Sequence, residues 1–176
     1  MKRTPAILII LALTSLAAVD SAQEKHPKKP LIGVATIKNS TTEPLSVQTL
    51  RLGLLQELDN KITSSVELAG QSPDEIVADA RKKQCDYILY NDFISAKRLD
   101  RGPRETPGGR DSDPYAPAGR FVVRVRFKLV ALGAARPRMD DTTMSSNSSM
   151  VTAQEAAEGA LRGVRQFVVS ELRTSK

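Results

Sequence analysis

Hydrophobic and polar positions divide the chain after Pro30 into strand-like and helix-like segments. Residues 31–37 (LIGVATI) form a continuous apolar run rich in β-branched residues, which is typical of a strand covered on both faces. Apolar residues then recur at steps of three and four, which predicts a helix. They are Val47, Leu50, Leu54, Leu58 and Ile62, with Leu52 and Leu55 widening the face. A second candidate strand, 66–69, ends at Gly70.

The alternation of strand and helix continues through residues 72–94. Ser72, Pro73 and Glu75 have the spacing of a capping box with proline at the first helical position, so we expect a helix to begin there. Three consecutive basic residues, 81–83, lie at its C-terminal end, where they interact favourably with the negative end of the helix dipole. Residues 86–94 (DYILYNDFI) follow as a third strand. Cys85 precedes it and is expected to be a small buried residue.

The second half of the chain changes character. Residues 99–119 contain four prolines and four glycines, which predicts a long mobile loop. Residues 120–132 alternate apolar and polar positions, as in a half-buried strand. The polar stretch 140–152 permits a weak edge strand, and 153–172 form a helix that a second capping box, Thr152 with Glu155, would start.

These elements predict one α/β domain of the α+β sandwich type over residues 31–172, followed by a tail, 173–176. A mixed sheet of about four to five strands would pack with three helices in the order β-α-β-α-β-β-(β)-α. The 176 residues are 40% hydrophobic with a net charge of +6, an ordinary globular composition. Cys85 is the single cysteine, so no internal disulfide can support this core.

The N-terminal residues have the three-part layout of a secretory signal peptide. Lys2 and Arg3 precede an apolar run, 6–18, that is too short to span a membrane, and small residues follow it. We expect cleavage after residue 21, with Ala18 as a competing site. An extended tether, 22–30, would join this leader to the domain. No cysteine for lipidation lies near the junction, so the sequence predicts a periplasmic or secreted protein whose membrane contact is through its leader alone.

Motifs for catalysis, metals or cofactors are missing from the sequence. It has no P-loop, dinucleotide-binding, HExxH or CxxC pattern, and its single histidine, His26, lies on the tether. Asp111 and Asp113 resemble the start of a calcium loop, but the other ligands of such a loop are missing. We therefore expect no catalytic residues, cofactor or metal. Nucleic acid is not an expected partner, since the leader indicates export and the basic face of the strand 120–132 carries no aromatic residue for stacking.

Basic residues form the candidate interaction surface. One face of the strand 120–132 presents consecutive cations, and nearby arginines extend the set, which comprises Arg120, Arg124, Arg126, Lys128, Arg136 and Arg138. Two interpretations remain open. The cations are either a solvated strand face that discourages edge-to-edge aggregation, or a surface for an anion or an acidic partner.

Three features of the domain resemble a group of bacterial envelope proteins that includes the amino-terminal domain of TolB, the curli secretion protein CsgG and the penicillin-binding-protein activator LpoB. The shared residues are a strand ending in an Asn turn (Val34, Ile37, Asn39, Ser40) and the segment Cys85, Asp86, Tyr87, Ile88 and Leu89 after a helix. The long strand 120–132 and the alanine-rich last helix fit the remainder. The chain departs from CsgG and LpoB in having no lipidation cysteine, and it has no pair of long amphipathic hairpins, so a secretion channel is not expected.

Together with the leader and the missing catalytic motifs, the resemblance implies an exported, non-enzymatic domain that mediates protein–protein interaction or assembly in the cell envelope. An alternative is a binder of an anionic envelope polymer or lipid headgroup through the basic strand. A second alternative is a hydrolase with an unrecognised site. The oligomeric state and the identity of the partner stay open.

Overall fold

A computed structural model of the protein describes residues 29–99, 120–133, 139–146 and 152–174. The elements are β1 (Leu31–Val34), β2 (Lys38–Asn39), α1 (Val47–Leu58), β3 (Ser64–Glu67), α2 (Pro73–Lys82), β4 (Tyr87–Leu99), β5 (Arg120–Ala131), β6 (Met139–Ser145) and α3 (Ala153–Thr174). The strands form one mixed sheet in the order β3-β1-β4-β5-β6, with β2 paired to β4. The α+β class, the mixed sheet and the three helices are as expected. The expected leader, most of the tether and most of the expected loop lie outside the described residues, whereas α3 continues to Thr174 and so includes the first two residues of the expected tail.

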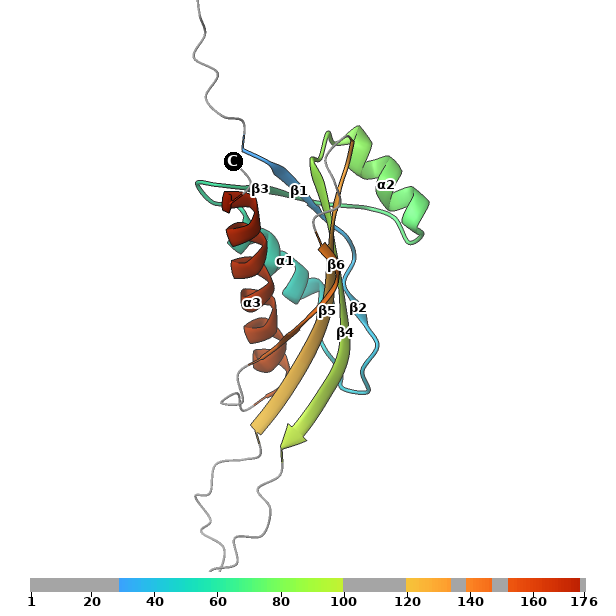
Figure 1. The fold of residues 1–176 in the computed structure, drawn as a ribbon. Helices are drawn as coiled ribbons and strands as arrows, with labels where there is room; N and C mark the ends of the chain where they lie inside the picture. The colour runs from blue at the N-terminus through green and yellow to red at the C-terminus, as the bar shows by residue number, and fades with distance from the viewer. Residues whose placement is uncertain (1–28, 100–119, 134–138, 147–151, 175–176) are drawn as a thin grey trace, which may run out of the picture.

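The sheet is parallel on one side and antiparallel on the other. β1 pairs in parallel with β3 and β4, and β2 pairs in parallel with β4. β4 and β5 form a long antiparallel ribbon that extends to the pair Leu99 and Arg120, and β6 completes the edge. In Figure 1 the ribbon projects away from the end of the molecule at which β1 begins and α3 ends.

Two expected strands have different bounds in the structure. The run 31–37 is not one strand, because β1 ends at Val34. The chain then moves away from β3, and β2, at Lys38–Asn39, pairs with β4 alone. The expected strand 86–94 continues to Leu99, because pairing with β5 supports backbone hydrogen bonds beyond its apolar part. Leu99 therefore belongs to β4 and not to the expected loop.

The first helix is shorter than its apolar spacing predicts. α1 ends at Leu58, and Ile62 lies in a turn where the Asn60 side chain accepts hydrogen bonds from the backbone N–H groups of Ile62 and Thr63. Such a local side-chain bond competes with continued helix. Leu52, expected on the apolar face, is 46% exposed. The strand expected at 66–69 lies two residues earlier, at Ser64–Glu67.

One face of the sheet carries most of the hydrophobic core. α1 and α3 lie side by side on this covered face, as Figure 1 shows. Its cluster of buried apolar side chains contains alternate residues of β5 (Val123, Val125, Phe127 and Leu129), as period-two alternation predicts. Phe127 contacts the Phe167 ring of α3 edge to face, with ring centroids 5.8 Å apart.

Of the three described helices, only α2 lies on the other face of the sheet (Figure 1). The cluster there is small: Ala35, Leu68, Ile76, Ala80, Cys85 and Ile88 are its buried members. Both expected capping boxes are confirmed. The Glu75 N–H donates to the Ser72 hydroxyl at 3.2 Å, and the Glu155 N–H donates to the Thr152 hydroxyl at 3.1 Å. Cys85 is buried as expected, and burial raises the pKa of its thiol.

A buried arginine joins α1 to the ends of two strands. The Arg51 guanidinium, only 4% exposed, donates to the backbone oxygens of Val34 (2.6 Å) and Leu68 and forms an ion pair with Glu67 at 2.5 Å. Burial lowers the pKa of Arg51, while the charge of Glu67 and the hydrogen bond to it oppose this shift. In the described ranges, none of the three helices is long and apolar enough to cross a membrane.

Candidate functional site

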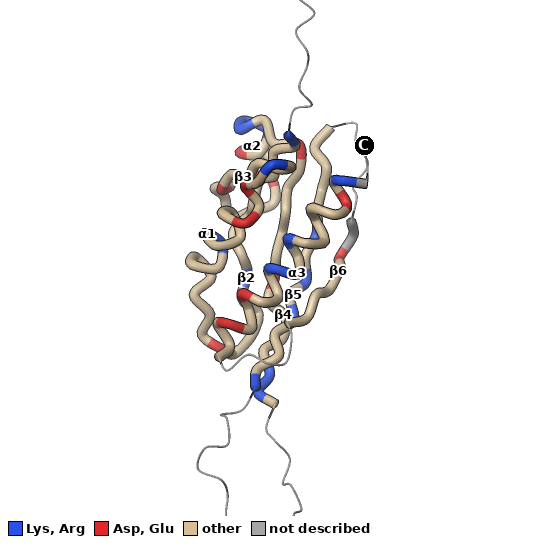
Figure 2. The backbone as a smooth tube through the Cα atoms, turned by 90° about the vertical axis from the view of Figure 1, so that its left-hand side faces the viewer, with Lys and Arg blue, Asp and Glu red and all other residues tan. Residues whose placement is uncertain are grey.

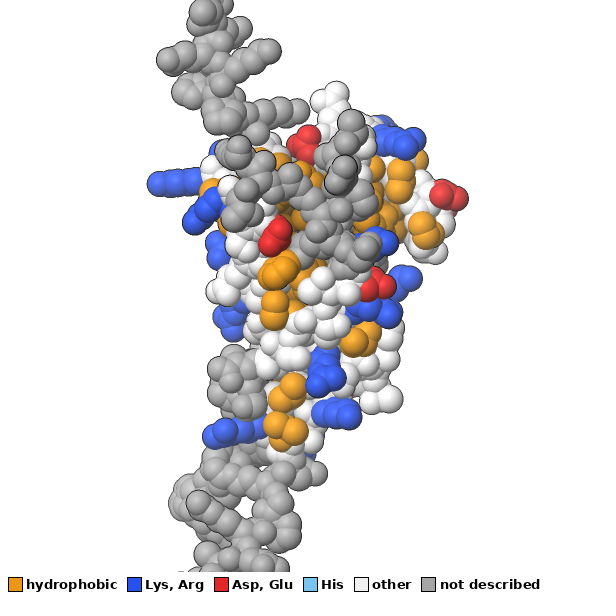
Figure 3. All heavy atoms as spheres, viewed as in Figure 1, with side chains coloured by type: hydrophobic (Ala, Val, Ile, Leu, Met, Phe, Trp, Pro, Cys, Tyr) orange, Lys and Arg blue, Asp and Glu red, His pale blue; other side chains and the backbone are white. Residues whose placement is uncertain are grey.

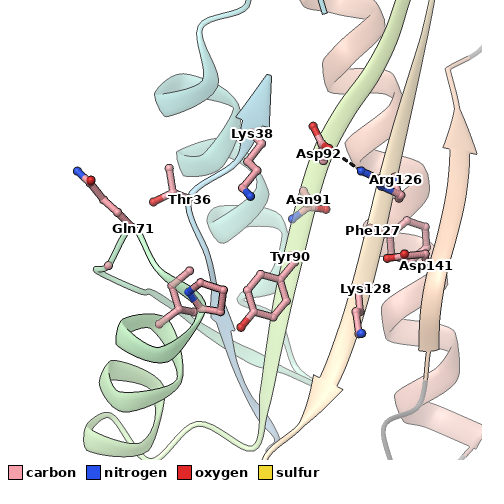
Figure 4. Close-up of a pocket in the computed structure, with 13 residues that line it drawn as sticks. Thr36, Lys38, Gln71, Tyr90, Asn91, Asp92, Arg126, Phe127, Lys128 and Asp141 are labelled. Carbon is pink, nitrogen blue, oxygen red and sulfur yellow. Dashed lines mark hydrogen bonds and ion pairs between the residues drawn. The ribbon is translucent and has the colours of Figure 1, made fainter. Parts of the chain in front are cut away.

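A cavity of about 650 Å³ opens where α2 stops covering the sheet. Its walls come from the segment between β1 and β2, from the beginning of α2, and from β4, β5 and β6 (Figure 4). Five charged residues and one tyrosine are among those that line it: Lys38, Asp92, Arg126, Lys128, Asp141 and Tyr90. Pro73 and Ile76 of α2 form an apolar wall. The site thus combines basic, acidic and apolar groups in one concavity.

Three charged residues lie in one row across the sheet. Lys38 of β2 and Arg126 of β5 are both register partners of Asp92 on β4, so they flank it on opposite sides. The Asp92 carboxylate accepts a hydrogen bond from the Ser40 hydroxyl at 2.7 Å and forms an ion pair with Arg126 at 2.9 Å. Figure 4 marks the second contact with a dashed line. Both carboxylate oxygens of Asp92 are therefore engaged within the protein.

Tyr90 and Lys128 form the next row toward α2. They are register partners on β4 and β5, and the Tyr90 ring packs against the small apolar cluster under α2. Burial raises the pKa of the Tyr90 hydroxyl, so it remains a hydrogen-bond donor at neutral pH. Lys38 and Lys128 form no ion pair with any residue in the described part of the chain. Their ammonium groups are available to a ligand.

The turn before α2 forms part of the cavity wall. Gly70 has φ +125°, a conformation that side-chain-bearing residues rarely adopt, and a Cβ there would lie 3.0 Å from the Glu75 side chain. The Gln71 N–H donates to the Glu75 carboxylate at 2.9 Å, which fixes the turn against the helix. Gln71 and Pro73 are thereby held at the wall of the cavity.

The donors of this site suit the binding of an anion. Asp92 already accepts hydrogen bonds from the Ser40 hydroxyl and from Arg126, so both of its oxygens are engaged within the protein. Within the residues that the structure describes there is no histidine and no group of three side chains suited to hold a metal ion. Lysine ammonium groups and a tyrosine hydroxyl, in contrast, are direct donors to anions.

The structure separates the basic residues that the sequence grouped together. Arg124, Arg126 and Lys128 share the face of β5 opposite the main core, and Arg124 and Arg126 are exposed. Arg120 lies at the far end of the β4–β5 ribbon, about 20 Å from Arg126 at 3.4 Å per strand residue. Figure 2 shows basic residues gathered at this end, and Figure 3 shows other basic side chains on both the upper and the lower parts of the molecule. Arg136 and Arg138 lie outside the described residues.

Sequence reasoning missed the residues that complete the cavity. Lys38 follows the expected strand 31–37, Tyr90 and Asp92 lie within the expected strand 86–94, and Asp141 lies in a stretch treated as a weak edge strand. Alternation within β4 could have brought two of them together: Tyr90 and Asp92 are separated by a single residue, so they share a face. We define the open face as the part of the sheet that begins at the edge of α2 and that no other described element covers, formed by Tyr90, Asp92, Arg124, Arg126, Lys128 and Asp141.

Comparison with solved structures identifies relatives in fold. PelC from Paraburkholderia phytofirmans, solved as a dodecamer, aligns with a TM-score of 0.51 at 17% identity over 77% of this chain and 86% of PelC. The hypothetical protein CT253 from Chlamydia trachomatis aligns with a TM-score of 0.57 at 7% identity over 84% of this chain and 100% of CT253. Lipoprotein GNA1162 from Neisseria meningitidis aligns with a TM-score of 0.44 at 11% identity, over 82% of this chain and 97% of its own.

The chain therefore has a fold that occurs in bacterial proteins, PelC and CT253 among them. No protein-family model and no curated protein matches the sequence. The narrower resemblance to the TolB amino-terminal domain, CsgG and LpoB stays a prediction from the sequence.

Proposed function

We propose that this protein is an exported domain of the bacterial envelope that binds another envelope protein through the open face, without catalysing a reaction. The observation that carries the proposal is the position of Arg124, Arg126 and Lys128 on the part of the sheet that no described element covers. The main core lies on the other face, so it does not need these side chains. Several cations on one exposed face attract an acidic surface of a partner and orient it.

The envelope location is supported by two independent features. The first 21 residues have the layout of a secretory leader. The fold is shared with bacterial proteins. A role like that of the TolB amino-terminal domain, CsgG or LpoB is the narrower form of this proposal and rests on the sequence resemblance alone.

Chemical cross-linking in intact cells tests the proposal. The tagged protein is cross-linked, purified from the envelope fraction and its partners identified by mass spectrometry. We expect a specific partner that the variant Arg124→Ala/Arg126→Ala/Lys128→Ala captures about tenfold less, because the attracting charges are gone.

A matched control removes the same charge elsewhere. Lys61, Arg162 and Arg173 are exposed, and among the described residues they form no ion pair. The variant Lys61→Ala/Arg162→Ala/Arg173→Ala should capture the partner as the unmodified protein does. Equal losses in the two variants, or no specific partner at all, would contradict the proposal.

A second candidate function is binding of an anionic envelope polymer or lipid headgroup. The regular spacing of the cations on β5 favours this function. Cations at alternate strand positions lie roughly 7 Å apart, in a row that a linear polyanion could follow. Its affinity should fall steeply with salt, because exposed charges are screened within about 10 Å at 0.1 M. Cosedimentation with phosphatidylglycerol vesicles across a salt series measures this, and salt-independent binding would exclude it.

A further inference from the structure

We propose that the cavity beside α2 binds an acidic side chain of the partner together with an apolar neighbour, so that the recognised element is an extended peptide segment carrying Asp or Glu next to a hydrophobic residue. This inference rests on the proposed function, since it names what the partner protein presents to the open face. It adds Lys38, Tyr90 and the apolar wall of α2 to the basic residues of β5.

The free charge in the cavity is positive. Its titratable lining comprises Lys38, Arg126 and Lys128 against Asp92 and Asp141, which gives +3 − 2 = +1. Asp92 is occupied by Arg126 and Ser40, so an incoming ligand meets two lysines and one aspartate. β2 and β5 lie on opposite sides of β4, so the lysines that they carry flank the strand bearing Tyr90. A carboxylate placed above this strand lies between both ammonium groups, and the Tyr90 hydroxyl supplies a further donor.

The wall opposite these cations is apolar. Pro73 and Ile76 of α2 line it, and the Tyr90 ring packs beneath them against the same small cluster. Figure 4 shows Tyr90 projecting toward the α2 side of the cavity. A ligand that places only a charge here leaves this surface in contact with water. A hydrophobic side chain next to the acidic one buries the surface and gains the corresponding transfer free energy.

Charge and size favour a peptide over a phosphate group. Asp141 repels a dianion more strongly than a single carboxylate, and its own oxygens can accept a hydrogen bond from a peptide N–H. The volume of about 650 Å³ lies within the range of roughly 300–1,000 Å³ that is typical of small-ligand sites. That volume suits a few residues of an extended segment.

Selection from a randomised heptapeptide library displayed on phage tests the inference. The purified protein is the bait, and the variant Lys38→Gln/Lys128→Gln serves as counter-selection. We expect enriched peptides to contain Asp or Glu beside an aliphatic or aromatic residue. The most enriched peptide is then synthesised with a fluorescent label, and its Kd is measured by anisotropy. Replacing its acidic residue with the amide, or using the double variant, should each weaken binding by about tenfold, as expected for losing two exposed ion pairs.

The matched control is Lys61→Gln/Arg162→Gln. Lys61 and Arg162 are exposed and lie outside both the open face and the cavity, so removing the same two charges there should change the Kd by no more than about twofold. Peptides enriched without an acidic residue, no enrichment at all, or equal weakening by Lys61→Gln/Arg162→Gln overturn the inference. The inference is also overturned if inorganic phosphate or phosphatidylglycerol vesicles displace the labelled peptide at a lower molar concentration than the unlabelled peptide does. That result would assign the cavity to a phosphate group.

The outcome is separable from that of the proposed function. If cross-linking captures a partner through Arg124, Arg126 and Lys128 but no acidic peptide binds, the cavity inference fails and the proposed function stands. If the triple variant captures the partner unchanged, the proposed function fails whatever peptides the cavity selects.

Discussion

Two neighbouring residues of β5 summarise the difference between the faces of this sheet. Phe127 is 1% exposed and packs against α3, whereas Lys128 reaches the cavity on the opposite face. Among the described residues, the cluster on the Phe127 side has twenty-one buried apolar members and the cluster under α2 has six. The first face therefore supplies most of the apolar burial that stabilises the fold. The second face is left with charged groups that folding does not require.

Helix length explains why the second face stays open. α2 has ten residues and so spans about 15 Å, whereas the thirteen residues of β4 extend over about 43 Å. α3, with twenty-two residues, spans about 33 Å and can follow most of a strand. Apolar side chains under α2 accordingly end at Tyr90, and from Asp92 onward none of the three described helices lies above the same face of β4.

The largest expected effect is the loss of Phe127. The substitution Phe127→Ala removes a ring from the main cluster and leaves a cavity, so we expect a loss of about 3–5 kcal/mol in the free energy of unfolding. Lys128→Ala, one residue along, should change it by no more than about 0.5 kcal/mol. Urea denaturation followed by circular dichroism measures both. Similar losses from the two substitutions would show that the two faces contribute equally to stability.

A smaller effect, of opposite sign, is expected at Asn91. Strand alternation places this residue between Leu89 and Phe93 on the covered face, and its buried amide nitrogen and oxygen have no hydrogen-bond partner among the described residues. An unpaired buried polar group costs free energy, so Asn91→Leu should stabilise the protein by about 1 kcal/mol.

Thr63→Val provides the contrast for Asn91→Leu. Thr63 is equally buried, but its hydroxyl donates to the Leu58 backbone oxygen, so its loss should destabilise the protein by about 1 kcal/mol. Denaturation midpoints compare the two variants directly. If Asn91→Leu destabilises as well, the amide has a partner, such as a buried water, that belongs to the core.

The element types could be predicted because each depends on local pattern. Period-two alternation identified the two faces of β5, and the hydroxyl-to-glutamate spacing at Ser72 and Thr152 located the starts of α2 and α3. Strand ends could not be predicted in this way. β4 continues to Leu99 because β5 lies beside it, and that pairing joins residues far apart in sequence.

The cavity was beyond sequence reasoning for a related reason. Lys38, Tyr90 and Lys128 come from three strands, and only the sheet order places β2 and β5 on either side of β4. The pattern of the expected strand 86–94 also gives no measure of how much of it a helix covers, and α2 is too short to cover one whole face of β4. The basic residues of β5 were identified because one strand carries them.

The smallest expected effect concerns how α2 is held on the second face. With few apolar contacts, this helix is also fixed by polar ones: the Asp79 carboxylate accepts from the Ala69 N–H and from Lys83, each at 2.7 Å. The Lys83 hydrogen bond and then the Ala69 bond lower the pKa of Asp79 below its ordinary value of 3.8. A carboxylate with a lowered folded pKa contributes stability above the unfolded value, and this contribution disappears as the pH falls through the folded value.

Asp79→Asn should therefore destabilise the protein slightly at neutral pH, and the difference from the unmodified protein should shrink to nothing as the pH falls below the lowered pKa of Asp79. Thermal unfolding from pH 7 to pH 2 measures the difference. Glu158→Gln is the control, because this exposed α3 residue forms no ion pair with another described residue. A difference that persists at pH 2 would mean that Asp79 acts through its shape and not its charge. The anchoring of α2 would then depend on the six-residue cluster beneath it.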